Sequence, residues 1–239
     1  MADYYPYEPD VIDFAIRILG EVQLGGLTFF ITETMVSTWI VLGLILIFAA
    51  IVRIKSNSWN ALDKPSGLQN FVELCVDIFA GFFKNSASPK LMYLAPWFFS
   101  LFVFLLVSNT IGITGLRPPT ADWGVTFPLA FSSFILFQYA GFKYRPKNYV
   151  KGWLNPTPIF LPINLLGEFA RPVALSFRLF GNVLGGVVLL SLLYGIAPVV
   201  MRFVFPAFLH MYFDLAAGLL QAFIFTVLSL TFVGLAAED

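Results

Sequence analysis

The sequence has little charge, one cysteine and one histidine. Only 12% of its 239 residues are charged, and the 14 basic and 14 acidic residues cancel to a net charge of zero. Proteins that bind nucleic acid usually carry a basic patch, and this balance gives no sign of one. The single Cys75 cannot form an internal disulfide, and one histidine without a second ligand makes no metal site. We therefore expect no nucleic-acid partner, no metal and no cofactor.

Two further features are missing. The chain has no Gly-rich phosphate loop of the Walker type, so we expect no nucleotide chemistry in it. Its first 13 residues include four acidic residues and lack the basic start and apolar core of a signal peptide, so no cleaved targeting segment is expected.

Apolar residues dominate the chain instead. Hydrophobic residues make up 59% and aromatic residues 18%, and the mean hydropathy is +0.83. This composition predicts an all-α integral membrane protein with one membrane domain, about five spans and one interfacial amphipathic helix. The expected elements are an irregular outer N-terminal segment at 1–33, spans at 34–55, 92–113, 124–142, 162–197 and 199–237, and the interfacial helix at 68–84.

The basic residues are unevenly distributed in this arrangement. Three of them fall on one side, and nine fall on the other: Arg53, Lys55, Lys64, Lys84, Lys90, Lys143, Arg145, Lys147 and Lys151. By the positive-inside rule the nine are cytoplasmic. After five crossings the N-terminus is then outside and the C-terminus in the cytoplasm.

The last two apolar segments are too long for ordinary spans. A helix over 162–197 would be roughly 54 Å long, against a hydrocarbon core of about 30 Å. A steep tilt or a break is needed, and Pro172 is a candidate for a kink. Pro198 is a candidate for the corner of a hairpin. Such a pair of helices would lie obliquely along the face of another component.

Arg178 lies inside the first of these segments. A central arginine costs about 3 kcal/mol on insertion scales, and it remains charged at any reachable pH. Positions three and four residues away hold no acidic side chain, so its counter-charge must come from another helix, another subunit or an ion. Asn164, Arg171 and Asn182 share its helix face, and Glu168 is placed to pair with Arg171.

A second polar stripe follows in the last segment, with His210, Asp214 and Gln221 spaced by four and seven. These residues could line a hydrated path in which Asp214 exchanges protons while Asn182 and Gln221 hold water. The alternative is that Asp214 pairs with Arg178 as a structural link. For His210 alone, an interfacial position near the outer surface is favoured.

The run Arg171-Pro-Val-Ala-Leu-Ser-Phe-Arg178-Leu-Phe-Gly-Asn182 and the later Leu220-Gln221-Ala-Phe-Ile-Phe-Thr-Val-Leu closely resemble subunit a of F-type ATP synthases. The segments Pro119-Thr-Ala-Asp122 and Pro65-Ser-Gly-Leu-Gln-Asn70 resemble its upstream landmarks. The resemblance implies a non-catalytic stator in a bacterial plasma membrane. Its partners would be a ring of c subunits, subunit b or an equivalent peripheral stalk, the remaining subunits, the bilayer, and protons or Na⁺.

The resemblance also implies roles for individual residues. Arg178 would draw the ring carboxylate into its ionised form and separate two offset half-channels. Asn182, Gln221 and Asp214 would belong to the outer half-channel, and Glu168 and Arg171 would lie near the cytoplasmic exit. Further candidates for channel lining are His210, Asp122 and Asn164. Some relatives carry a glutamate where this chain has Val187, so the number of titrating groups in the outer path is open.

Two other classes of function fit an intramembrane arginine. A self-contained secondary transporter could use it to bind an anionic substrate, but the sequence has neither repeated halves nor paired broken helices. A structural scaffold would tolerate its replacement. A transporter should function alone, whereas a stator depends on an oligomeric partner.

Overall fold

The fold is an all-α membrane protein, as the sequence predicts. The computed structural model describes residues 17–24, 27–57, 59, 65–155, 157–196 and 208–237. Within these residues, five helical stretches are long and apolar enough to cross a membrane: Glu33–Ser56, Pro89–Thr114, Trp123–Tyr144, Pro158–Leu193 and Phe208–Ala237. The five predicted crossings are therefore present.

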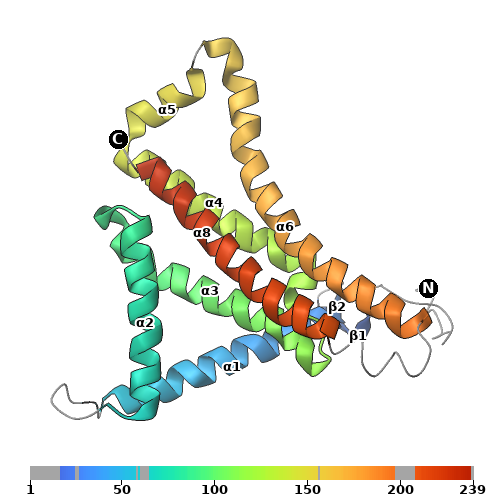
Figure 1. Cartoon of the computed structure of the whole chain (residues 1–239). Coiled ribbons are helices and arrows are strands. Elements are labelled where there is room, and N and C mark those ends of the chain that lie inside the picture. The colour runs from blue at the N-terminus through green and yellow to red at the C-terminus, as the bar shows by residue number, and fades with distance from the viewer. Residues whose placement is uncertain are drawn as a thin grey trace.

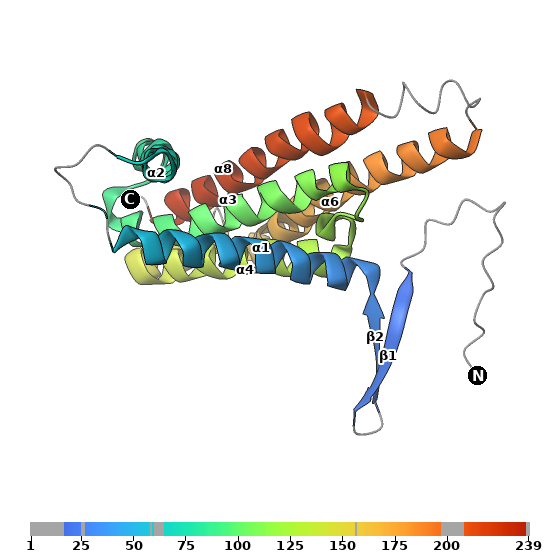
Figure 2. The ribbon, with the colours of Figure 1, turned by 90° about the horizontal axis from the view of Figure 1, so that it is seen from below.

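Four helices run lengthwise beside one another, and a fifth lies across one end. The four are α1 (Glu33–Ser56), α3 (Ala95–Thr110), α4 (Trp123–Tyr144) and α8 (Gly218–Ala237), whereas α2 (Gly67–Ser86) crosses their direction (Figure 1). In Figure 2, α2 is seen along its axis while the others lie in the plane. Ser66 caps α2 by accepting a hydrogen bond from the Gln69 amide at 3.3 Å. This orientation is the one expected of an interfacial helix.

The core forms where α3 and α8 pack antiparallel and α2 and α4 cover them. Its buried side chains include Phe83, Phe98, Leu105, Phe225 and Leu230, none more than 1% exposed. By contrast, α1 buries only Thr34, Ser37 and Val41, all near its N-terminal end. Most of α1 therefore presents an apolar surface outward, as a helix in contact with lipid does.

The long helix α6 spans Leu161–Ile196 without a break. It contains Pro172 and bends along its length (Figure 1), as expected where proline removes a backbone hydrogen bond. The following stretch, Phe208–Ala237, has a π-helical segment at Met211–Ala217 before α8 begins. Such segments are frequently found at functional sites. The predicted corner at Pro198 lies outside the described residues.

One prediction about a connecting segment was wrong. The region around Gly20 was expected to be irregular, but strands β1 (Ile18–Leu24) and β2 (Leu27–Thr32) form an antiparallel hairpin, which projects away from the helices at the end opposite α2 (Figure 2). After the basic residues that end α4, a short helix α5 (Pro146–Leu154) begins with a proline at its first position, where the missing amide is tolerated.

Candidate functional site

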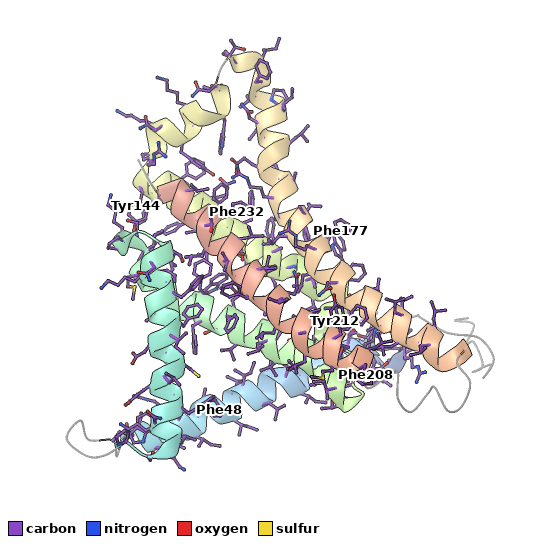
Figure 3. All side chains as sticks on the ribbon, in the orientation of Figure 1. Phe48, Tyr144, Phe177, Phe208, Tyr212 and Phe232 are labelled. Atoms are coloured by element: carbon purple, nitrogen blue, oxygen red, sulfur yellow. The ribbon has the colours of Figure 1, made fainter. Side chains whose placement is uncertain are left out.

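Arg178 lies near the middle of α6, and its side chain is exposed. No described residue forms an ion pair or hydrogen bond with it. Large apolar side chains of α6 and α8 are also exposed, among them Phe177 of α6 at 54% and Leu220 of α8 at 58%. Figure 3 shows Phe177 on α6. An unpaired guanidinium at this depth is too costly to face lipid, so the surface around Arg178 needs a partner that supplies negative charge.

The polar residues of α6 and those of the last helical stretch lie at similar positions along the two helix axes. The Phe213 ring packs against Gly186, where an added β-carbon would lie 3.1 Å from Phe213 Cβ. α6 and the last helical stretch run in opposite directions (Figures 1 and 2). Eight residues back along α6 lead to Arg178, and eight residues forward along the other helix lead to Gln221. Because both helices rise similarly per residue, these two side chains lie at about the same level.

Asp214 is buried and pairs with His210. The His210 Nδ1 atom lies 2.6 Å from Asp214 Oδ2, one helical turn away. The carboxylate also presses against Gly112, where a β-carbon would lie 2.9 Å from Cγ and both oxygens. His210 is therefore a partner of Asp214. The alternative pairing of Asp214 with Arg178 is absent among the described residues.

Sequence reasoning missed a second buried polar group beside Asp214. Asn109, which is 2% exposed, donates from Nδ2 to the Gly218 carbonyl at 2.9 Å and accepts from Thr120 Oγ1 at 2.7 Å. Asn109 interrupts the apolar segment 92–113, and that interruption was the available signal. These bonds fix the carbonyl of Gly218, the first residue of α8, against the end of α3.

Gln221 and Asn182 complete the polar side chains at this end. Gln221 is 6% exposed, and its buried Nε2 has no hydrogen-bond partner among the described residues. Asn182 is partly exposed, one turn beyond Arg178. A buried amide without a partner costs roughly 1–3 kcal/mol, so water or a partner group is the expected ligand of Gln221.

The predicted pair of Glu168 and Arg171 is present at the other end of α6. Arg171 Nη1 donates to Glu168 Oε2 at 3.1 Å. The same guanidinium lies between two aromatic rings, with Cζ 5.1 Å from the Phe137 centroid and 5.5 Å from the Phe232 centroid. Figure 3 shows Phe232 toward the C-terminal end of α8, where α6 and α8 diverge. Arg171 is thus held by one carboxylate and two rings.

An open pocket surrounds this pair. Its volume is about 220 Å³, and it is lined by Phe137, Tyr149, Glu168, Arg171, Phe232, Leu235 and Ala236. A smaller cavity of about 20 Å³ lies next to it and shares Phe137, Arg171 and Phe232 as wall. Neither cavity could be read from the sequence, because the walls of the larger come from α4, α5, α6 and α8 and those of the smaller from α4, α6 and α8.

Tyr149 of α5 borders the pocket as a neutral group. Its hydroxyl donates to Gln138 Oε1 at 2.9 Å. Burial, reinforced by the nearby Glu168 carboxylate, raises the pKa of Tyr149 far above its usual range. Tyr149 therefore remains protonated at physiological pH, and its one O–H is already bonded to Gln138.

Two other predicted residues make local structural contacts. Asp122 caps α4 by accepting from the Gly124 amide at 2.8 Å, and its other oxygen accepts from Thr34 Oγ1 of α1 at 2.9 Å. Asn164 donates to the carbonyls of Trp153 and Asn155 at 2.8 and 2.9 Å, which ties the start of α6 to the end of α5.

Comparison with known proteins matches this arrangement to one family. The family model described as ATP synthase A chain matches residues 35–234. The chain belongs to this family. Similar proteins include "ATP synthase subunit a, sodium ion specific" of Propionigenium modestum, 34% identical, with 96% of this chain and 82% of the relative covered. A "subunit a 2" of Syntrophotalea carbinolica is 35% identical over 73% of this chain and 75% of its own length.

A third similar protein also covers most of this chain. An "ATP synthase subunit a 2" of Acaryochloris marina is 32% identical over 88% of this chain and 87% of its own length. The resemblance noted in the sequence is thereby confirmed. As a member of this family, the chain is a multi-pass membrane component of ATP synthases that takes part in ion transport and ATP synthesis.

Proposed function

We propose that the chain is the stator of the Fo sector and couples ion translocation to rotation of a c-ring. Arg178 is the fixed charge of this mechanism: it attracts the ring carboxylate in its ionised form and keeps two half-channels separate. The observation that carries the proposal is the exposed, unpaired Arg178 in the middle of α6, within an apolar surface. A carboxylate on a facing subunit supplies the charge that the described chain lacks.

The outer half-channel runs past His210 and Asp214 to Asn182 and Gln221. Asp214 carries the exchangeable proton of this path, and the 2.6 Å contact with His210 gives that proton a second acceptor. Gln221, with an unpartnered buried amide at the level of Arg178, binds the last water before the ring.

The inner half-channel opens through the 220 Å³ pocket at Glu168 and Arg171. Glu168 takes up the ion that leaves the ring and passes it to the aqueous phase. The carried ion is a proton or Na⁺, according to the ring site; the Propionigenium modestum relative is named as sodium ion specific. The chain itself catalyses no chemical step.

The inner half-channel faces the cytoplasm of a bacterium, and the chain forms one domain in its plasma membrane. This orientation is supported by the basic residues at the end marked by α2 and α5. Of the nine assigned there, Lys64 lies outside the described residues and the other eight are in or next to the ends of α1, α2, α4 and α5. Other partners are a peripheral stalk built on subunit b or its equivalent and the remaining subunits.

The test uses the complete complex in lipid vesicles. Arg178→Ala should abolish ATP synthesis driven by an imposed proton or sodium gradient, and Arg178→Lys should be poor because an ammonium lacks the planar five-donor fork. Arg53→Ala, which removes an exposed charge at the end of α1, is the matched control and should leave synthesis near normal. Coupled synthesis near the wild-type rate in Arg178→Ala would rule out the mechanism.

A further inference from the structure

The side chain of Lys143 lies over the rings of three tyrosines at the C-terminal end of α4. Its Nζ atom is 4.8 Å from the ring centroid of Tyr93, 5.2 Å from that of Tyr139 and 5.5 Å from that of Tyr144. An ammonium within about 6 Å of a ring centroid is attracted by that ring. Lysine has a flexible four-carbon stem, so these contacts hold in one place a charge that would otherwise move widely.

The three rings come from neighbouring ends of two membrane spans. Two of them belong to the last six residues of α4, and Tyr93 belongs to the 3₁₀ helix Pro89–Leu94 just before α3. Tyr144 Oη donates to the Lys90 carbonyl at 3.0 Å, which ties the two elements together, and Figure 3 shows Tyr144 at this end of α4. Tyr93 and Tyr139 are 50% and 49% exposed. Exposed tyrosines at the ends of apolar spans lie at the headgroup level of a bilayer.

The positive charge of Lys143 is not neutralised within the described part of the chain. Its side chain is exposed, and the ion pairs among the described residues involve other side chains. Lys90, three residues before Tyr93, is exposed as well and adds a second cation to this surface. Rings attract an ammonium without cancelling its charge, and its three donors can still form hydrogen bonds. The Lys143 ammonium is therefore held in place and available to an anion.

An exposed apolar face of α4 leads from this cation into the membrane. Pro128, Phe131, Ile135 and Tyr139, which we call the α4 stripe, follow one another at spacings of three or four and are all exposed. Residues at such spacings share one side of a helix. Other sides of α4 pack against α6 and α8. Lys143 follows the α4 stripe after four more residues, so this side of the helix presents apolar side chains at membrane depth and a cation at the headgroup level.

We propose that Lys143 and the three tyrosines bind the phosphate of an anionic phospholipid, whose acyl chains lie along the α4 stripe. The phosphate oxygens accept hydrogen bonds from the ammonium. The ligand is a lipid because a free phosphate ion would leave the adjoining apolar side chains without a partner. An anionic headgroup is preferred to a zwitterionic one, since a headgroup that brings its own cation gains less from an unneutralised lysine. This site does not depend on the stator mechanism.

The test identifies the lipid that lies against the α4 stripe. Ile135, in the middle of the stripe, is replaced by the photoreactive amino acid p-benzoylphenylalanine. The assembled complex is placed in bilayers with equal amounts of phosphatidylglycerol, which is anionic, and phosphatidylcholine, which is zwitterionic, with identical acyl chains. After illumination, mass spectrometry of the digested chain shows which lipid is attached. We expect phosphatidylglycerol to exceed phosphatidylcholine about fivefold, the preference that one lysine near the surface provides.

Four variants, each in the Ile135 background, separate a held cation from general surface charge. Lys143→Gln should lower the ratio to about one. Tyr93→Leu keeps every charge but removes the nearest ring, so the ratio should fall by at least half, whereas Tyr93→Phe keeps the ring and should retain most of the preference. Lys147→Gln is the matched control, because it removes an exposed charge on α5 that has no ring contact among the described residues. Its ratio should stay near fivefold.

Three outcomes would overturn the proposal. The first is equal attachment of the two lipids with Lys143 present. The second is a preference that Lys143→Gln and Lys147→Gln lower equally and Tyr93→Leu leaves unchanged, which would assign it to general surface charge. The third is attachment to another subunit in place of a lipid, which would show that a protein covers the α4 stripe. The ratio compares two lipids on the same chain, so a variant that assembles in smaller amounts still gives a result.

Discussion

Gly218 is the position where the packing around the site can be tested most directly. A β-carbon added there would lie 2.9 Å from Asn109 Cβ and 3.7 Å from its backbone carbon, so Gly218→Ala forces α3 and α8 apart. The same separation stretches the 2.9 Å bond from Asn109 Nδ2 to the Gly218 carbonyl. Asp214 and Gln221, on either side of Gly218, would lose their positions relative to α3.

The size of the effect follows from three terms. Overpacking costs about 1–3 kcal/mol, and the lost hydrogen bond costs about 0.5–1.5 kcal/mol. Alanine favours the helix over glycine by about 1 kcal/mol, so the net loss in the free energy of unfolding is about 1–3 kcal/mol. For a chain of this size the midpoint of thermal unfolding should fall by about 3–10 °C.

Gly43→Ala is the matched control, because Gly43 lies inside α1 and has nothing within 4 Å of an added β-carbon. It gains the same helix propensity without a clash, so its midpoint should stay equal or rise. The assay is the temperature at which half of the chain unfolds in the detergent-solubilised complex. Equal midpoints for Gly218→Ala and Gly43→Ala would refute the close approach of α3 and α8.

Three further predictions address the outer path, the topology and α1. Asp214→Asn keeps the shape of the carboxyl, so the amount of assembled complex should stay unchanged while proton flux per complex falls at least roughly tenfold. Asp214→Glu should retain much of the flux. Normal flux in the Asn variant would remove Asp214 from the path. In a Cys75→Ser background, an impermeant thiol reagent should label Thr114→Cys only from outside and Asn148→Cys only from the cytoplasm, and labelling from one common side would contradict five crossings. Thr34→Val deletes the bond to Asp122 and should lower the free energy of unfolding by about 0.5–1.5 kcal/mol. Thr38→Val should change it less, because the Thr38 hydroxyl bonds only to the Thr34 carbonyl within α1. Equal losses would mean that the link to α4 contributes nothing.

Local sequence signals were sufficient for the spans and for pairs within one helix. Long apolar runs predict helices because the backbone must satisfy its hydrogen bonds within the segment when it lies in lipid. The ion pair of Glu168 with Arg171 follows from spacing alone, since residues three apart share a helix face. His210 and Asp214 have the equivalent spacing of four, so their contact was also predictable, although His210 had been interpreted by itself.

Contacts between distant segments were not predictable in the same way. Asn109 meets Gly218 across 109 positions, and only the packing of α3 on α8 brings them together. The cavities beside Arg171 depend on the divergence of α6 from α8, which no periodicity records. The β1–β2 hairpin was missed, although the alternation of polar and apolar residues from Glu21 to Leu24 already indicated a strand.

The interior between the two polar regions fits the proposed mechanism, in which the ion leaves this chain to cross the membrane. The polar side chains around Asp214 reach as far as Gln221, and the smaller cavity is lined by Ser229. Ser229 lies about two helical turns, or roughly 12 Å, beyond Gln221 along α8. Between these two levels, α6 and α8 bury four apolar side chains: Leu175, Leu179, Ala222 and Phe225.

The hydroxyls at this level have partners already. Thr226 Oγ1 donates to the Ala222 carbonyl at 2.9 Å, and Thr126 and Ser176 bond to each other at 3.2 Å. Bonds of this kind use up the hydroxyl protons, so these side chains have no free donor for a water chain through the apolar layer. In the proposed mechanism, the ion therefore passes this layer along the exposed surface that carries Arg178, bound to a moving partner that supplies its own carboxylate.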